Sequence, residues 1–117
     1  MPARIVVVHD DPAFIESMKA KFGGDLAAFN DPTEALRALE KARDITFLVT
    51  RVQFADKQPV GLSLARLARA ARPDVRTIFT GDDNHRSYTR GLGEFIPEPV
   101  QPIHVAMIIE WIDDRRE

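Results

Sequence analysis

The sequence predicts an α/β fold of the doubly wound (βα)5 type, built on one five-stranded parallel sheet. Short apolar segments rich in β-branched residues alternate with amphipathic segments along the whole chain. The connections between them are brief, and several begin with helix-capping residues. Strands that alternate with helices in this way form parallel sheets covered on both faces. The 117 residues are enough for one domain with a single core, so we expect residues 1–117 to form one domain.

The first two strand–helix units carry the clearest local signals. Ile5–Val8 is a β-branched run typical of a strand covered on both faces, and Asp11 followed by proline predicts a helix that stops at Gly23. Leu26–Phe29 is the second expected strand. Asp31, with a proline after it and a glutamate three residues on, predicts a helix that runs to about residue 43.

The remaining elements follow in the same alternation. Strands are expected at residues 45–50, 75–80 and 94–97. Helices are expected at residues 61–71, 84–91 and 102–115, and the helix at 84–91 is short and polar.

Composition excludes several classes of function. The formal net charge of −2 gives no basic surface for nucleic acid. The longest apolar run near the N-terminus is Ile5–Val8, too short for a signal peptide or a membrane span, so we expect no membrane association and a cytoplasmic location. The absence of cysteine excludes disulfides, thiolate catalysis and cysteine-based zinc sites.

Five polar residues fall where the expected strands end. They are His9 and Asp10 after the first strand, Arg51 after the third, Thr80 at the end of the fourth and Glu98 just past the fifth. Sites in parallel α/β sheets lie beyond the carboxyl ends of the strands, so we expect these side chains to share one pocket.

The order and spacing of these segments resemble the receiver domain of bacterial two-component response regulators, from about Arg4 to Trp111. Such domains carry an acidic pair after the first strand, a phosphoacceptor aspartate ending the third and a Thr or Ser ending the fourth. An aromatic switch residue lies in the fifth strand, with a Lys-Pro just after it. The resemblance implies a flavodoxin-like fold, with Phe95 as the switch aromatic and Gly61 opening the third helix. Ala55 stands where a proline is common.

Three of the five pocket positions depart from that pattern. His9 replaces the first acid, Arg51 replaces the phosphoacceptor and Glu98 replaces the lysine, whereas Asp10 and Thr80 are retained. We therefore expect a degenerate phosphorylation pocket in an atypical receiver.

The substitutions remove the chemistry of phosphoryl transfer. The reaction needs a carboxylate nucleophile, Mg²⁺ on hard oxygen ligands and a cation for the added charge. Arg51 stays protonated and offers no lone pair, its charge opposes a metal ion, and Glu98 repels a phosphoryl group. We predict a phosphorylation-independent, non-enzymatic domain with no metal, no cofactor and one locked conformation of Thr80 and Phe95.

Arg51 is expected to pair with Glu98 or Asp10, although two solvent-facing side chains are the alternative. A conventional phosphorylated regulator with Asp56 as a substitute acceptor is a second possibility. A small flavodoxin-like flavin or nucleotide binder is a third, opposed by the lack of a glycine-rich loop after the first strand. His9 beside Asp10 also allows titration near neutral pH.

The last helix carries the signal for a partner. Its apolar residues occupy more than one face, and the surplus side chains Met107 and Trp111 predict an exposed apolar surface. The resemblance implies contact through the fourth helix, fifth strand and fifth helix, which adds Tyr88. The expected partner is a protein or a second copy, such as a histidine kinase or another regulator. We expect a stand-alone domain, because the chain ends at Glu117 just after this helix; a fragment of a longer regulator is the alternative.

Overall fold

The computed structural model describes residues 4–54 and 60–115. Ala55 and Asp56, which figured in the sequence predictions, lie outside the described residues. Five parallel strands form one sheet in the order β2-β1-β3-β4-β5. They are β1 (Ile5–Val8), β2 (Leu26–Phe29), β3 (Phe47–Arg51), β4 (Arg76–Gly81) and β5 (Glu94–Pro97). This confirms the predicted α/β class and the five-stranded parallel sheet.

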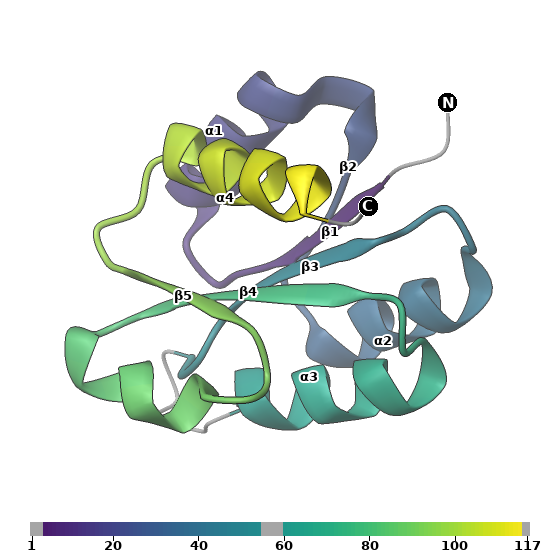
Figure 1. The fold of residues 1–117 in the computed structure, drawn as a ribbon. Helices are drawn as coiled ribbons and strands as arrows, with labels where there is room; N and C mark the ends of the chain where they lie inside the picture. The colour runs from purple at the N-terminus through teal and green to yellow at the C-terminus, as the bar shows by residue number, and fades with distance from the viewer. Residues whose placement is uncertain (1–3, 55–59, 116–117) are drawn as a thin grey trace.

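Helices cover both faces of the sheet (Figure 1). One face carries α1 (Pro12–Phe22) and α4 (Pro102–Asp114), and the other carries α2 (Pro32–Lys41) and α3 (Val60–Ala71). The chain starts at β1, adds β2 on one side and then adds β3, β4 and β5 on the other. The strand order therefore reverses between β1 and β3, and the carboxyl edge at such a point is the usual binding site of an open α/β sheet.

The core has two layers, set by the alternation of side chains along each strand. Val7 of β1 and Val49 of β3 pack toward α1 and α4, with Met18. Val6 and Leu48 pack toward α2 and α3. All are fully buried, so β1 and β3 must be apolar on both faces, as the β-branched runs predicted.

The predicted starts of the first two helices are confirmed. The Asp11 side chain accepts a hydrogen bond from the Ala13 amide at 3.0 Å, and the Asp31 side chain accepts one from the Thr33 amide at 2.9 Å. A proline occupies the first turn in both helices, where its missing amide costs nothing. Gly23 ends α1 with a positive φ of 57°.

The expected helix at residues 84–91 is a 3-10 helix, η2 (Asp83–Thr89), rather than an α-helix. Its sequence is polar, and Thr89 is its one buried residue. Packing of an apolar face is what stabilises most helices in proteins, and this segment has too little of one to stabilise a longer α-helix. Its N-cap residue, Asp82, makes no side-chain capping bond. The segment after η2 is linked to α3 by a hydrogen bond, in which the Arg69 side chain donates to the Gly91 carbonyl oxygen at 2.7 Å.

At the amino edge of the sheet, Arg72 joins the ends of α2 and α3. Its guanidinium donates to four backbone carbonyl oxygens, those of Leu39, Ala42, Arg43 and Ile45, at distances between 2.6 and 3.2 Å. The last carbonyls of a helix have no partner within the helix, so Arg72 supplies donors to the C-terminus of α2. This role was not predicted from the sequence.

Candidate functional site at the carboxyl edge

Strand register brings the predicted pocket residues together. Arg51, the last residue of β3, pairs with Thr80 of β4, and Val8 of β1 pairs with Thr50. His9 and Asp10 therefore leave β1 beside the end of β3. Glu98 follows β5, and its backbone amide donates to the Gly81 carbonyl oxygen at 2.8 Å. The pocket is therefore formed by one or two residues at the carboxyl end of each of four strands, β1, β3, β4 and β5.

Gly61 places the start of α3 against the end of β3. A Cβ atom at this position would overlap the Arg51 carbonyl oxygen, and the Gly61 amide donates to the Val52 carbonyl oxygen at 3.3 Å. Only glycine permits this approach. The close contact gives a physical reason for the glycine that the resemblance placed at the opening of the third helix.

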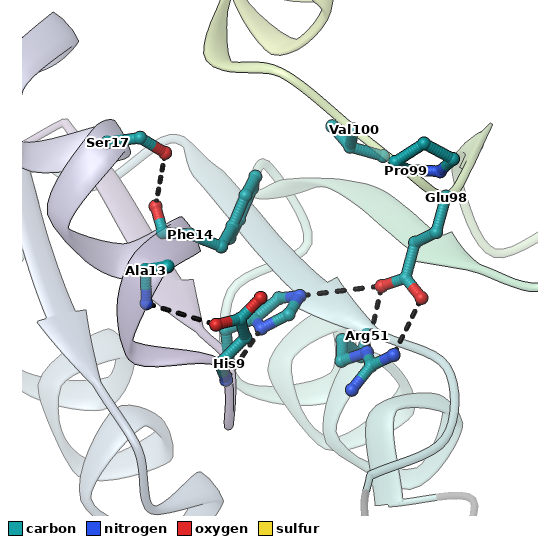
Figure 2. A pocket seen from close by; sticks show the side chains of 9 residues that line it. His9, Ala13, Phe14, Ser17, Arg51, Glu98, Pro99 and Val100 are labelled. Carbon is teal, nitrogen blue, oxygen red and sulfur yellow. Dashed lines mark hydrogen bonds and ion pairs between the residues drawn. The ribbon is translucent and has the colours of Figure 1, made fainter.

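The Arg51 guanidinium lies inside the pocket and binds the Glu98 carboxylate (Figure 2), and it also binds the carboxylate of Asp10. Its Nε and Nη2 donate to the two carboxylate oxygens of Glu98 at 2.8 and 2.7 Å, and its Nη1 donates to Asp10 Oδ1 at 2.8 Å. The two bonds to Glu98 form the parallel fork that favours arginine at such sites. In the structure Arg51 therefore pairs with both candidate acids rather than pointing into solvent.

Glu98 is the centre of the pocket. Besides the Arg51 fork, its Oε2 accepts the Thr80 hydroxyl at 3.2 Å and lies 3.5 Å from His9 Nε2. Thr80 is fully buried and His9 is 4 % exposed. The His9 ring packs on Phe14, with ring centroids 4.5 Å apart. All five predicted pocket residues thus belong to one bonded cluster.

These contacts fix the charges of the pair. The pKa of Glu98 is lowered to about 2 by the hydrogen bond from His9 and by the Arg51 guanidinium, against the opposing effect of burial. The pKa of Arg51 is raised above its usual range, chiefly by the hydrogen bond to Glu98. Arg51 is a cation and Glu98 an anion throughout the physiological range of pH.

The cluster does not fit the Mg²⁺ ion that phosphorylated receivers use. The oxygens that would face a metal are bonded to Arg51, whose cationic nitrogens lie 2.7 to 2.8 Å from them. Within residues 4–54 and 60–115, no group of three His, Asp or Glu side chains is arranged to hold a metal ion.

A cavity of about 570 Å³ opens beside the cluster, between α1 and the segment after β5. Its polar lining includes His9, Arg51 and Glu98, and its apolar walls include Phe14 and Val100. The cavity therefore lies next to the ion pair rather than in its place.

Phe95, the predicted switch aromatic, lies outside this cavity. It is half-buried and packs with Val52, Ala65 and Phe79. The Arg86 guanidinium carbon lies 5.0 Å from the centre of its ring. Phe95 lies on the strand next to β4, where it pairs with Phe79, the residue before Thr80.

The predicted partner residues are all exposed. Met107 and Trp111 are 60 % and 46 % exposed on α4, and Tyr88 is 58 % exposed on η2. Figure 1 shows α4 and η2 on opposite faces of the sheet. Ile103 is 46 % exposed, and the sequence analysis did not include it among the partner residues. It lies four residues before Met107, and this spacing indicates that the two side chains are neighbours on the helix surface. We call Ile103, Met107 and Trp111 the α4 stripe.

Comparison with known proteins agrees with this architecture. The receiver domain protein (CheY-like) from Methanospirillum hungatei has a TM-score of 0.80 at 21% identity, covering 97% of this chain and 95% of that one. The receiver protein from Sinorhizobium medicae has a TM-score of 0.80 at 17% identity, covering 99% and 98%. A structure described as adenylate cyclase from Rhodopirellula baltica has a TM-score of 0.78 at 17% identity, covering 95% and 87%.

No protein-family model matches the sequence, and no curated protein sequence matches it. The structural similarity establishes the fold: it is the CheY-like, flavodoxin-like fold of response regulator receiver domains. Among the described residues, no helix has the length and apolar character to cross a membrane.

Proposed function

We propose that this chain is an atypical receiver-type module of two-component signalling that acts through protein–protein contacts and does not accept phosphate at position 51. The observation that carries the proposal is the Arg51 side chain, which holds Glu98 and Asp10 together inside the pocket. A guanidinium is no nucleophile, and it neutralises the carboxylates on which a metal ion would depend.

The same cluster supports one locked conformation. The Glu98 carboxylate gives the Thr80 hydroxyl an anionic acceptor inside the protein, at 3.2 Å. A ligand shifts a conformational equilibrium only if it interacts differently with the two states. Because the internal carboxylate already satisfies Thr80, no added phosphoryl group is needed to hold that side chain in place.

Intact-mass spectrometry after incubation with acetyl phosphate and Mg²⁺ tests the proposal. The wild-type mass is expected to stay unchanged. The matched control is the double variant Arg51→Asp/Glu98→Lys, which restores an acceptor carboxylate and a cation at the two positions. That variant is expected to gain the mass of one phosphate. A stable gain on the wild-type protein would falsify the proposal and favour a substitute acceptor, for which Asp56 is the first residue to replace.

We further propose that the α4 stripe and Tyr88 contact a protein partner or a second copy of the chain. The stripe places three large apolar side chains at intervals of four residues on one exposed helix face. Trp111 is the only tryptophan in the chain, so its fluorescence reports on this face alone. A dilution series followed by sedimentation velocity and Trp111 emission distinguishes self-association from a monomer that binds another protein.

Absence of enzymatic activity and a cytoplasmic location remain predictions. The first rests on the lack of a nucleophile at position 51, and the second rests on the sequence alone. No contact in the pocket favours a flavin or nucleotide binder. A thermal-shift screen with flavin mononucleotide and adenosine nucleotides is expected to leave the melting temperature unchanged.

A further inference from the structure

His9 is the one titratable side chain of the pocket whose present hydrogen bonds depend on its being neutral. Its Nδ1 accepts the backbone amide of Asp11 at 3.1 Å, so that nitrogen carries no proton. Its Nε2 faces Glu98 Oε2 at 3.5 Å, which places the ring proton there. Neutral imidazole has one donor and one acceptor nitrogen, and both are used.

Protonation would change both partners of the ring. Imidazolium has two donor nitrogens and no acceptor, so Nδ1–H cannot face the Asp11 amide. An acceptor for that proton is Asp10 Oδ1, which lies 3.8 Å from Nδ1. The same oxygen accepts the Nη1 donor of Arg51. A proton on His9 therefore competes with Arg51 for Asp10 and frees the amide at the start of α1.

The carboxylates on both sides of the ring favour that competition. Asp10 and Glu98 place carboxylate oxygens 3.8 and 3.5 Å from Nδ1 and Nε2 of His9, so both donor nitrogens of an imidazolium would face an acceptor. Burial acts in the opposite direction, since His9 is 4 % exposed. The groups that surround the ring are Asp10 and Asp11 from the β1–α1 turn, Arg51 from β3, Glu98 after β5 and the uncharged Phe14 from α1.

We propose that His9 is a proton-operated switch, in which acidification moves Asp10 from Arg51 toward His9 and releases the Asp11 amide at the N-terminus of α1. Imidazole is the side chain whose unperturbed charge change lies nearest to neutral pH, so a histidine suits such a switch. The inference deepens the proposed function by naming a stimulus for the same pocket. It is measured without a phosphodonor, so the two proposals can fail separately.

The chain contains a matched internal control. His104 Nδ1 accepts the backbone amide of Gln101 at 3.1 Å, the same contact as in His9. His104 is exposed on the first turn of α4, and within residues 4–54 and 60–115 it makes no ion pair with a carboxylate. Protonation of His104 is expected to release the Gln101 amide without any effect on Arg51.

The experiment is an NMR titration of uniformly ¹⁵N- and ¹³C-labelled protein from pH 8 to pH 5. At pH 8, His9 is expected to show an unprotonated Nδ1 and a protonated Nε2. On acidification, the Asp11 amide and the Arg51 Nε–H signals are expected to move with the midpoint of the His9 ring. The Gln101 amide is expected to follow the His104 ring instead.

Two variants sharpen the test. His9→Gln is expected to abolish the shared response of Asp11 and Arg51. Asp10→Asn keeps an acceptor oxygen but removes its charge, so the ring midpoint is expected to fall by about 0.7 pH units or more, the effect of one charge some 4 Å away. The proposal is wrong if Asp11 and Arg51 do not follow the His9 ring in the wild type, or if Asp10→Asn leaves the midpoint unchanged.

Discussion

At each edge of the sheet an arginine joins separate elements, and the partners of these two arginines, Arg51 and Arg72, differ in kind. At the carboxyl edge, Arg51 holds the carboxylates of Glu98 and Asp10. At the amino edge, Arg72 holds four backbone carbonyl oxygens and also contacts the Asp74 carboxylate at 3.3 Å. Arg72 is the more buried, with 15 % of its side chain exposed against 27 % for Arg51.

The difference explains which role the sequence revealed. Carboxylates belong to particular residues, so Arg51, Asp10 and Glu98 could be recognised as charges that fall at one edge of a parallel sheet. Carbonyl oxygens belong to every residue, and the end of α2 looks like any other helix end in the sequence. The partners of Arg72 therefore became identifiable only when the fold placed α2 beside α3.

The largest effect is expected from Arg72→Ala. Removing the guanidinium leaves up to four carbonyl oxygens near the end of α2 without a donor, and we expect a loss of about 3 kcal/mol in the free energy of unfolding. Urea denaturation measures it. Arg76→Ala, at an exposed residue of the same edge, is the control and should change stability by less than about 0.5 kcal/mol. Equal effects of the two substitutions would show that the carbonyl contacts contribute little.

Arg51→Ala is expected to cost less, about 2 kcal/mol, because the pair is about one-quarter exposed rather than deeply buried. The loss reflects two carboxylates left without their cation. Glu98→Ala in the same chain should restore part of the stability, and a double-mutant cycle by chemical denaturation gives the coupling. If both single variants melt like the wild type, the ion pair does not contribute to stability.

The smallest effect is the acid dependence due to Glu98. Its pKa is lowered to about 2 from the ordinary 4.5, so its contribution is complete above about pH 4.5 and is lost as the pH falls toward 2. After allowance for solvent screening of a partly exposed group, we expect a contribution of about 1–2 kcal/mol. The measurement is the difference in unfolding free energy between wild type and Glu98→Gln from pH 6 to pH 2.5. A difference that does not shrink in acid would contradict the assignment.

Sequence patterns predicted the sheet and most helix starts because those depend on local chemistry. The Ile5–Val8 run predicted β1, and Asp11 and Asp31 predicted the starts of α1 and α2. The short polar helix expected at residues 84–91 is present as the 3-10 helix η2, because a polar segment has too little apolar surface to stabilise a longer α-helix.

The composition of the site was predictable, but its geometry was not. The sequence placed His9 and Thr80 in the pocket, whereas the convergence of both on Glu98 depends on how the chain leaves β5. Likewise, the sequence did not show that η2 and α4, the elements that carry Tyr88 and Trp111, lie on opposite faces of the sheet (Figure 1).

The fork between Arg51 and Glu98 also bears on how phosphoryl chemistry could be introduced into such a pocket. Aspartate at position 51 alone would gather three carboxylates, with those of Glu98 and Asp10, around an uncompensated space. Lysine at position 98 alone would press two cations together. Each single change is expected to weaken the protein, so a test of phosphoryl chemistry exchanges the two positions together, as in the Arg51→Asp/Glu98→Lys variant. Mutational libraries that vary one codon at a time would miss the functional combination.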